Sequence, residues 1–263
     1  MLKYLMPAFL AAPLALAAAP ANAANGWHAV QEHASEARTT KADLYYAHHR
    51  LRVETEGEST VMIIDLPSGD LTLVDGAKKM FAKASLQELV DMREKMKEQM
   101  KARMAQMPEE LRKNVEKMLA EQEAAQKRPL QIKKTKKKEK VAGYGCDYYD
   151  WTGPEGSGQS CISAKLPVDL APFQKDAKRL AAALAKTGAG SSAATNVELL
   201  QMAKYGFPLK TVKERKMGPQ TFKSTATLVK IEKATLAKGK FEAPKGFSKK
   251  TFQEFMQLSA ALR

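Results

Sequence analysis

Cysteine and histidine, the side chains that most often bind transition metals, are scarce in this 263-residue chain. It contains two cysteines, too few for a four-cysteine zinc site. Its four histidines lie near the start of the chain, and only His48 and His49 are neighbours. Adjacent residues of a strand point to opposite faces, so this pair is not expected to share a metal ion. We therefore predict no metal centre and no cofactor, and interpret the histidines as single surface residues.

The short motifs that mark many enzymes are also missing. The chain has no H-E-x-x-H, no G-x-S-x-G, no Walker loop and no Rossmann glycine pattern. The segment "GPEGSG" lacks the spacing of a phosphate-binding loop and lies where a turn between strands is needed. We therefore predict a protein that is not an enzyme.

Long apolar runs are absent except at the N-terminus. There a basic start at Lys3 is followed by an apolar run to about Leu16 and by a small-residue stretch that ends in Ala-Asn-Ala. This pattern is typical of a secretory signal peptide, and the run is shorter than the roughly 20 residues of a membrane span. We predict a cleavable signal peptide at residues 1–23, cut after Ala23, and a periplasmic or secreted protein. The residue directly after the cut is Ala24 and not a cysteine, which argues against a bacterial lipid anchor.

Acidic residues are the minority charge, with 29 against 43 basic ones and a formal net charge of +14. Much of the excess lies in "KRPLQIKKTKKKEK", residues 127–140, whose central lysines are Lys133, Lys134, Lys136, Lys137 and Lys138. Export and the lack of interleaved aromatics argue against nucleic acid as a partner. One interpretation is a solvated strand or loop whose lysines discourage edge-to-edge pairing. The other is attraction to an anionic membrane surface.

The two cysteines, Cys146 and Cys161, fall on the two arms of a predicted hairpin around "GPEGSG". In an oxidising compartment, an even cysteine count favours a disulfide over metal ligation or a catalytic thiol. Closing a loop of this length stabilises a fold by about 3 kcal/mol in the chain-entropy model. We therefore predict a Cys146–Cys161 bridge.

The order of elements predicts an α+β fold. Residues 27–83 alternate apolar and polar side chains between turns such as "PSGD", which indicates five or six antiparallel strands. A helical insertion is predicted at about 85–126, where Ser85 and Glu88 match a capping box, and a second at about 168–204. Strands are expected between and after these insertions, followed by a C-terminal helix. We interpret residues 24–263 as a single domain.

A methionine-rich stripe marks the first helical insertion. It consists of Leu89, Met92, Met96, Met100, Met104 and Met107. The spacing has the helical period of about 3.6 and continues through Leu111 and Val115, although Pro108 predicts a break or kink near Met107. Three interpretations stay open: packing on the core, contact with an apolar ligand or partner, and binding of Cu(I) by thioethers.

Three segments carry a resemblance to a known family. They are "VMIIDLPSGDLTLVDGAKKMFAKASLQEL", "VAGYGCDYYDW" and "YGFPLKTVKERKMGPQTFKSTATLVKIEKATLAKGKFEAPKGFSK". Together they resemble an exported bacterial family classed as a domain of unknown function and related to the lipoprotein-carrier (Lol-type) fold. The resemblance implies an open half-barrel, a curved antiparallel sheet whose concave side is covered by helices. Cys161 adds a second thiol to the family's usual cysteine, which supports the bridge.

These features lead to three functional hypotheses. The first is an exported, non-enzymatic protein that binds an apolar ligand, a lipid or an acyl chain, between its sheet and its helices. The second is an envelope interaction module that docks on anionic surfaces through the lysine-rich segment. The third is a methionine-rich copper-binding protein. The oligomeric state is left open.

Overall fold

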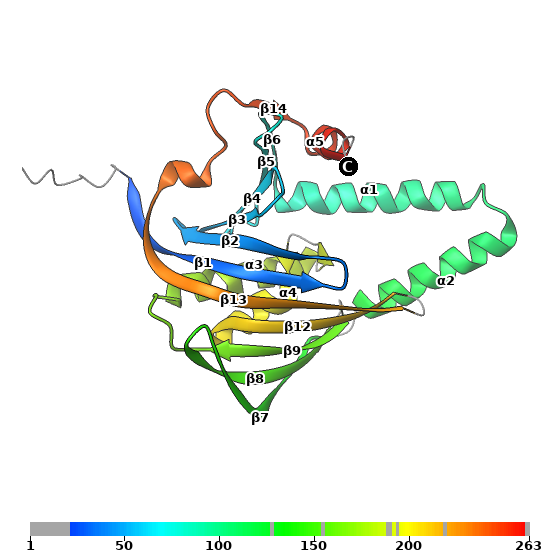
Figure 1. Cartoon of the computed structure of the whole chain (residues 1–263). Helices are drawn as coiled ribbons and strands as arrows, with labels where there is room; N and C mark the ends of the chain where they lie inside the picture. The colour runs from blue at the N-terminus through cyan, green and yellow to red at the C-terminus, as the bar shows by residue number, and fades with distance from the viewer. Residues whose placement is uncertain are drawn as a thin grey trace, which may run out of the picture.

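The computed structural model describes residues 22–126, 129–153, 156–187, 191–192, 195–217 and 220–260. Within these ranges one open sheet of twelve strands dominates the molecule, in the order β14-β6-β5-β4-β3-β2-β1-β13-β12-β9-β8-β7 (Figure 1). Every neighbouring pair is antiparallel except β14 and β6. The predicted α+β class and the open antiparallel sheet are therefore confirmed. The predicted signal peptide lies outside the described residues, apart from its last two positions.

The first half of the sheet is a meander of six strands. They are β1 (Ala23–Ser35), β2 (Thr39–Ala47), β3 (Arg50–Thr55), β4 (Thr60–Asp65), β5 (Leu71–Asp75) and β6 (Met80–Ala84). The predicted turn between β4 and β5 is closed by a hydrogen bond from the Gly69 N–H to the Asp65 carbonyl. Gly69 has φ of 78°, a conformation that glycine adopts without steric cost.

The second half of the sheet comes from the C-terminal part of the chain. It contains β7 (Gln131–Val141), β8 (Tyr144–Gly153), β9 (Gly156–Ser163), β12 (Phe207–Met217) and β13 (Gln220–Ala237). The short β14 (Ser248–Lys250) returns to the edge of the first half, beside β6. Strand β13 pairs with β1 along its length, so the two halves meet at the middle of the sheet. The predicted bridge is confirmed: Cys146 on β8 is bonded to Cys161 on β9, with 5.3 Å between their Cα atoms.

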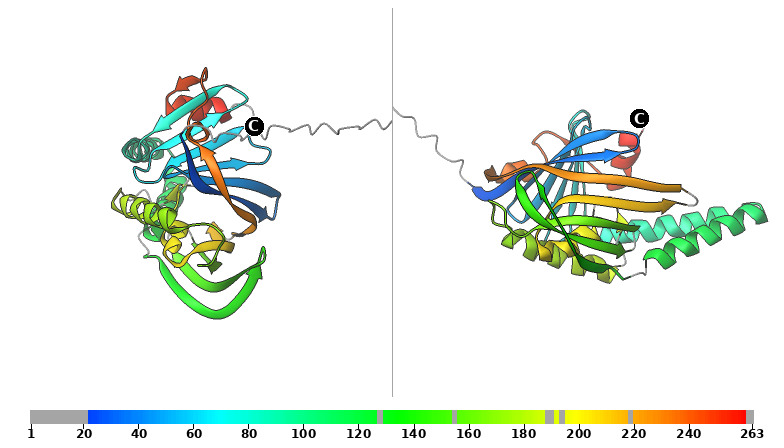
Figure 2. Two further views of the ribbon diagram at one scale, coloured as in Figure 1. Left: turned by 90° about the vertical axis from the view of Figure 1, so that its left-hand side faces the viewer. Right: turned by 60° about the horizontal axis from the view of Figure 1, so that its bottom comes forward.

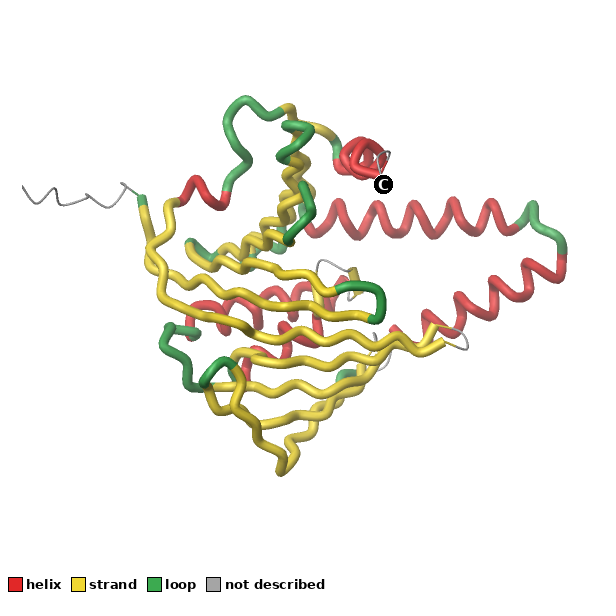
Figure 3. The backbone as a smooth tube through the Cα atoms, in the orientation of Figure 1, coloured by secondary structure: helices red, strands yellow, loops and turns green. Residues whose placement is uncertain are grey.

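Helix α3 lies on the concave side of the curved sheet (Figure 2). The helices are α1 (Leu86–Met104), α2 (Glu109–Gln126), α3 (Ala171–Thr187), the short α4 (Val197–Met202) and the C-terminal α5 (Phe252–Ala260). Of the two 3-10 turns, η1 (Ala203–Tyr205) and η2 (Lys238–Phe241), η2 packs through Phe241 on Ala47 and Ile63, on the face of the sheet opposite to α3. A separate ribbon pairs β10 (Ser191–Ser192) with β11 (Thr195–Asn196). Helix α3 covers the centre of the sheet, whereas α1 and α2 run out beyond the ends of the strands (Figures 1 and 3).

The main core fills the space between the sheet and α3. Trp27 of β1 is buried, stacks on Tyr46 at 5.6 Å between ring centroids, and meets Phe207 edge to face at 5.4 Å. Phe173 of α3 closes this group from the helix side, 5.5 Å from Trp27. The concave face beneath α3 is therefore occupied by the protein's own aromatic side chains.

Candidate functional site

Helices α1 and α2 form an arm, residues 86–126, that leaves the sheet directly after β6. The predicted capping box begins it: the Ser85 hydroxyl accepts from the Glu88 N–H, and the Glu88 carboxylate accepts from the Ser85 N–H. The predicted break is also present, because α1 ends at Met104 and α2 begins at Glu109, directly after Pro108. The arm is thus two helices joined by a short turn.

The methionine stripe is buried only at its beginning and at Met104. Leu89 packs against the main core, Met92 is half-buried, and Met104 is buried close to the turn. The other stripe side chains and their continuation on α2 are exposed: Met96 (67%), Met100 (39%), Met107 (37%), Leu111 (57%) and Met118 (61%). Core packing, one of the three interpretations of the stripe, is therefore wrong for Met96, Met100 and Met107. The period indicated a helix with an apolar face, but the helix extends past the strands that the face was expected to cover.

The lysine-rich segment forms β7, the edge strand at one end of the sheet. Asp147 on the neighbouring strand holds two of its lysines, Lys134 at 2.5 Å and Lys138 at 3.8 Å between nitrogen and carboxylate oxygen. The ammonium of Lys137 lies 4.1 Å from the centre of the Tyr148 ring, within range of a cation–π interaction. Part of the predicted anionic-surface site is therefore used by contacts within the sheet.

Lys133 and Lys136 are the remaining members of that predicted site. Both are exposed, and neither forms an ion pair with any residue in the described part of the chain. The pairing of β7 with β8 is irregular between Lys134 and Lys138. An edge strand with exposed lysines and an irregular register resists pairing with another strand, which fits the first of the two interpretations of this segment. Attraction to an anionic surface stays a prediction.

Glu139 connects the lysine strand to the body of the sheet. Its carboxylate accepts a hydrogen bond from the Tyr148 hydroxyl and lies 3.1 Å from the Lys210 ammonium. These contacts lower the pKa of Glu139, with the Tyr148 hydrogen bond as the largest cause. Burial, followed by the Glu139 contact, raises the pKa of Tyr148 to about 12. At neutral pH the pair is a carboxylate and a protonated tyrosine.

The histidines do not lie as the sequence indicated. His48 and His49 were placed on opposite faces of a strand, but they form the turn between β2 and β3 with φ of 53° and 61°. His28 is a part-buried side chain whose ring nitrogens face Asp43 at 2.6 Å and Glu232 at 3.4 Å. The expectation of single surface histidines is therefore wrong for His28, which bridges β1, β2 and β13.

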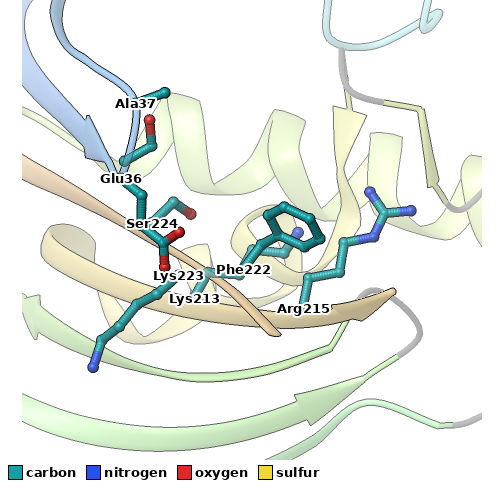
Figure 4. Close-up of a pocket in the computed structure, with 8 residues that line it drawn as sticks. Glu36, Ala37, Lys213, Arg215, Phe222, Lys223 and Ser224 are labelled. Carbon is teal, nitrogen blue, oxygen red and sulfur yellow. The ribbon is translucent and has the colours of Figure 1, made fainter. Parts of the chain in front are cut away.

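A hollow at one end of the sheet is the feature that sequence reasoning missed. It has a volume of about 400 Å³ and lies between the β1–β2 turn and the paired ends of β12 and β13 (Figure 4). Its cationic side chains include Lys213 and Arg215, with Phe222 beside them. The sequence signal was the alternation "KER" at residues 213–215 and "TFKS" at residues 221–224, which the pairing of β12 with β13 brings together.

Among the described residues, no three histidine, cysteine, aspartate or glutamate side chains come together in a way that could hold a metal ion. In the same part of the chain, none of the helices combines the length and the apolar character of a membrane span.

Comparison with known proteins gives a family and several distant structural likenesses. A family described as a domain of unknown function, DUF4412, matches residues 30–247. No curated protein matches the chain.

Among solved structures, the fold is similar to PNGF-II at a TM-score of 0.45 and 10% identity, over 90% of this chain and 33% of that one. It is also similar to MucB, at a TM-score of 0.37 and 10% identity, over 88% of this chain and 61% of that one. The Pseudomonas aeruginosa MucA/MucB complex matches at a TM-score of 0.37 and 9% identity, over 84% of this chain and 56% of the matched chain. The chain spans about a third of the length of PNGF-II.

Proposed function

Because the chain belongs to the DUF4412 family of unknown function, we propose its function from its own residues: it is a non-enzymatic protein that binds a lipid or acyl chain along its arm. Most of the large apolar side chains of the arm, Met96, Met100, Met107, Leu111 and Met118, are exposed, while the concave face of the sheet is covered by α3. The exposed side chains of the arm and the covered face of the sheet favour the arm over the interior as the binding surface.

The observation that carries the proposal is the exposure of the arm's apolar side chains. Five of the nine exposed large hydrophobic side chains described lie on α1, α2 and the turn between them. Four of these five are methionines, whose flexible, polarizable thioethers adapt to irregular apolar shapes. Gathered on one projecting element, such side chains mark a contact surface more often than a solvated one.

The compartment is part of the same proposal. Residues 1–23 have the pattern of a secretory signal, and a disulfide such as Cys146–Cys161 persists in an oxidising environment. A lipid-binding protein in the periplasm or the medium would meet its ligand outside the cytoplasm. The charge excess of +14 adds attraction toward anionic envelope components.

The test uses dihexanoylphosphatidylcholine, a soluble lipid without net charge, and the methyl NMR signals of ¹³C-labelled methionines. We expect the signals of Met96, Met100 and Met118 to shift on titration, because these side chains would contact the acyl chains. The triple variant Met96→Gln, Met100→Gln, Met118→Gln should bind at least tenfold more weakly. A tenfold loss of affinity corresponds to about 1.4 kcal/mol, which is less than the free energy that three methionine side chains gain by burying their apolar surface.

The matched control changes the same three methionines to leucine. It keeps an apolar face and should bind within about twofold of the wild type. A Gln variant that binds as well as the wild type, or a wild type that binds no lipid, would contradict the proposal. The Leu variant also removes three thioethers, so equal Cu(I) binding by it and the wild type would end the copper interpretation.

A second candidate function, docking on an anionic membrane, is favoured by one observation: Lys133 and Lys136 are exposed and lack an ion pair among the described residues. Binding to vesicles with phosphatidylglycerol should weaken as salt rises. Lys133→Gln with Lys136→Gln should weaken it more than Lys134→Gln with Lys138→Gln, because Asp147 already neutralises part of the second pair. Equal losses in the two variants, or salt-independent binding, would contradict this candidate.

A further inference from the structure

Four exposed methionines of the arm carry a chemistry that lipid binding does not use. They are Met96, Met100, Met107 and Met118, and we call them the arm methionines. A thioether sulfur is oxidised to a sulfoxide by peroxides, and the product is a polar, chiral side chain. An apolar contact surface that consists largely of exposed methionines is therefore open to conversion by an oxidant in the solvent.

The chain offers no thiol that would react first. It has two cysteines, and both are joined in the Cys146–Cys161 bridge, where they are buried. An exposed cysteine of low pKa is the usual place at which a protein is oxidised. In the described part of the chain, the exposed thioethers are then the sulfur atoms that a two-electron oxidant reaches most directly.

Burial divides the methionines into accessible and protected groups. Met104 belongs to the same stripe but is buried close to the turn, and Met80 and Met202 are buried in hydrophobic clusters of the main body. Outside the arm, Met256 on α5 is the one exposed methionine among the side chains that the structure describes. Accessibility therefore selects the arm and a single position on α5.

The arm methionines are placed where oxidation would change one contact surface. Met96 and Met100 are four residues apart, so they share a face of α1 and lie about 6 Å apart along its axis. Met107 lies in the turn between the helices and Met118 on α2. Sulfoxides at these positions would place polar oxygens on the face that binds the acyl chain. Each oxygen would have to lose its hydration before a lipid could cover it.

We propose that the arm methionines are an oxidation site, and that their conversion to sulfoxides by hydrogen peroxide releases the lipid from the arm. This inference rests on the proposed function, because it states how that binding surface is regulated. The sulfur attacks one oxygen of the peroxide: an S–O bond forms, the O–O bond breaks, and two electrons pass from the sulfur to the peroxide. The departing hydroxide takes up the proton of the transferred oxygen, so the products are one sulfoxide and one water.

The first experiment follows the order of oxidation on the full chain by peptide mass spectrometry after timed exposure to hydrogen peroxide. Without lipid, we expect Met96 and Met118 to gain an oxygen first, since they are the most exposed of the four. Met104 should react about tenfold more slowly, because its side chain is buried. Saturating dihexanoylphosphatidylcholine should slow oxidation of the arm methionines about twofold or more, because a bound acyl chain covers them, and leave Met256 unchanged.

The second experiment measures binding of the same lipid by calorimetry before and after peroxide treatment. The wild type should bind about tenfold more weakly after treatment, because apolar contacts become polar. A variant with all four arm methionines changed to leucine has no thioether at these positions. Compared with itself, it should keep its affinity within about twofold after treatment.

Met256→Leu is the matched control. It removes the exposed methionine that lies outside the arm. This variant should bind the lipid like the wild type and lose the same affinity on oxidation. Amide NMR spectra of every treated protein confirm that it is still folded, so that a loss of binding reports a change of the surface and not unfolding.

The outcomes separate this proposal from the proposed function. A wild type whose arm methionines are oxidised and that binds the lipid as before overturns the release. An equal loss of affinity in the leucine variant also overturns it, because other residues would then be responsible. Oxidation of Met104 as fast as that of Met96 overturns the selection of the arm by exposure. Failure of the untreated wild type to bind the lipid overturns the proposed function, whereas the order of oxidation is measured without lipid and is decided separately.

Discussion

At the scale of single residues, the buried carboxylate of Asp176 joins α3 to the β2–β3 hairpin. It is only 1% exposed, and one of its oxygens accepts from the Tyr46 hydroxyl at 2.7 Å and faces the His49 ring nitrogen at 2.8 Å. Burial, followed by the hydrogen bond to Asp176, raises the pKa of Tyr46. The tyrosine therefore stays protonated and keeps donating at any pH in which the protein would work.

Tyr46→Phe tests that contact. The substitution keeps the ring that stacks on Trp27 but removes the hydroxyl that donates to the buried Asp176, so we expect a loss of about 1–3 kcal/mol in the free energy of unfolding. Tyr45→Phe is the control: this neighbour points to the other face and its hydroxyl has no hydrogen bond within the described residues. Urea unfolding measures both variants, and equal losses would contradict the role of Asp176.

Glu139 gives a prediction in pH. Its folded pKa is lowered below the ordinary 4.5, so its stabilising contribution is present above 4.5 and is lost as pH falls through the folded pKa. Glu139→Gln should lower stability at pH 7 by about 1 kcal/mol, since the group is partly solvated. The difference from the wild type should shrink in urea titrations below pH 4.5.

Glu214→Gln is the control for this prediction. It breaks an exposed ion pair to Lys223 and should change stability by at most about 0.5 kcal/mol. A Glu139→Gln difference that stays constant from pH 7 to well below 4.5 would show that the carboxylate charge does not contribute.

Contacts of this kind mark the limit of what the sequence could predict at the residue scale. The Cys146–Cys161 bridge was predictable because cysteine count and hairpin spacing both pointed to it. The link between His49 and Asp176 was not, because 127 positions separate the partners and neither segment has a motif. The cations of the hollow were also missed, since only the register of β12 with β13 and of β13 with β1 brings them together.

At the scale of elements, local signals predicted the arm well. The capping box, the helical period and Pro108 indicated where α1 begins, which face is apolar and where the break lies. What those signals could not predict is what covers the face, because a period reports only that one side is apolar. The two helices of the arm were therefore predicted correctly, whereas the surroundings of their apolar face were not.

The capping box gives the arm a testable local stability. Ser85→Ala removes the cap of α1 and should raise amide hydrogen exchange about fivefold across the first turns of the helix, equivalent to about 1 kcal/mol. The matched control is Thr251→Ala, which removes the same kind of cap from α5, where Thr251 and Glu254 exchange hydrogen bonds. Exchange in α1 should not respond to it. Unchanged exchange in Ser85→Ala would mean that packing of Leu86 and Leu89, not the cap, holds the start of the arm.

At the scale of the whole molecule, the sheet is assembled from two groups of strands. Strands β1 to β6 form a meander that the alternating apolar and polar residues of 27–83 predicted, and strands β7, β8, β9, β12 and β13 join it through the pairing of β1 with β13. No sequence pattern predicted that pairing, because it connects residues about two hundred positions apart. One core nevertheless crosses the junction, since Ile64 of β4 and Tyr148 of β8 belong to the same buried cluster as Trp27.

A shared core predicts that the two groups of strands unfold together. The chain has two tryptophans, Trp27 at the β1–β13 junction and Trp151 on β8, so Trp27→Phe and Trp151→Phe each leave one reporter. In urea, the fluorescence transition of each variant should coincide with its own far-ultraviolet circular dichroism transition to within about 0.2 M, as two-state unfolding requires. Because both transitions are measured on the same variant, any destabilisation by the substitution shifts both of them equally. If the Trp151 signal changed at a lower urea concentration than the backbone signal, β7, β8 and β9 would unfold before the meander. The junction at β1 and β13 would then be a boundary between two cooperative units.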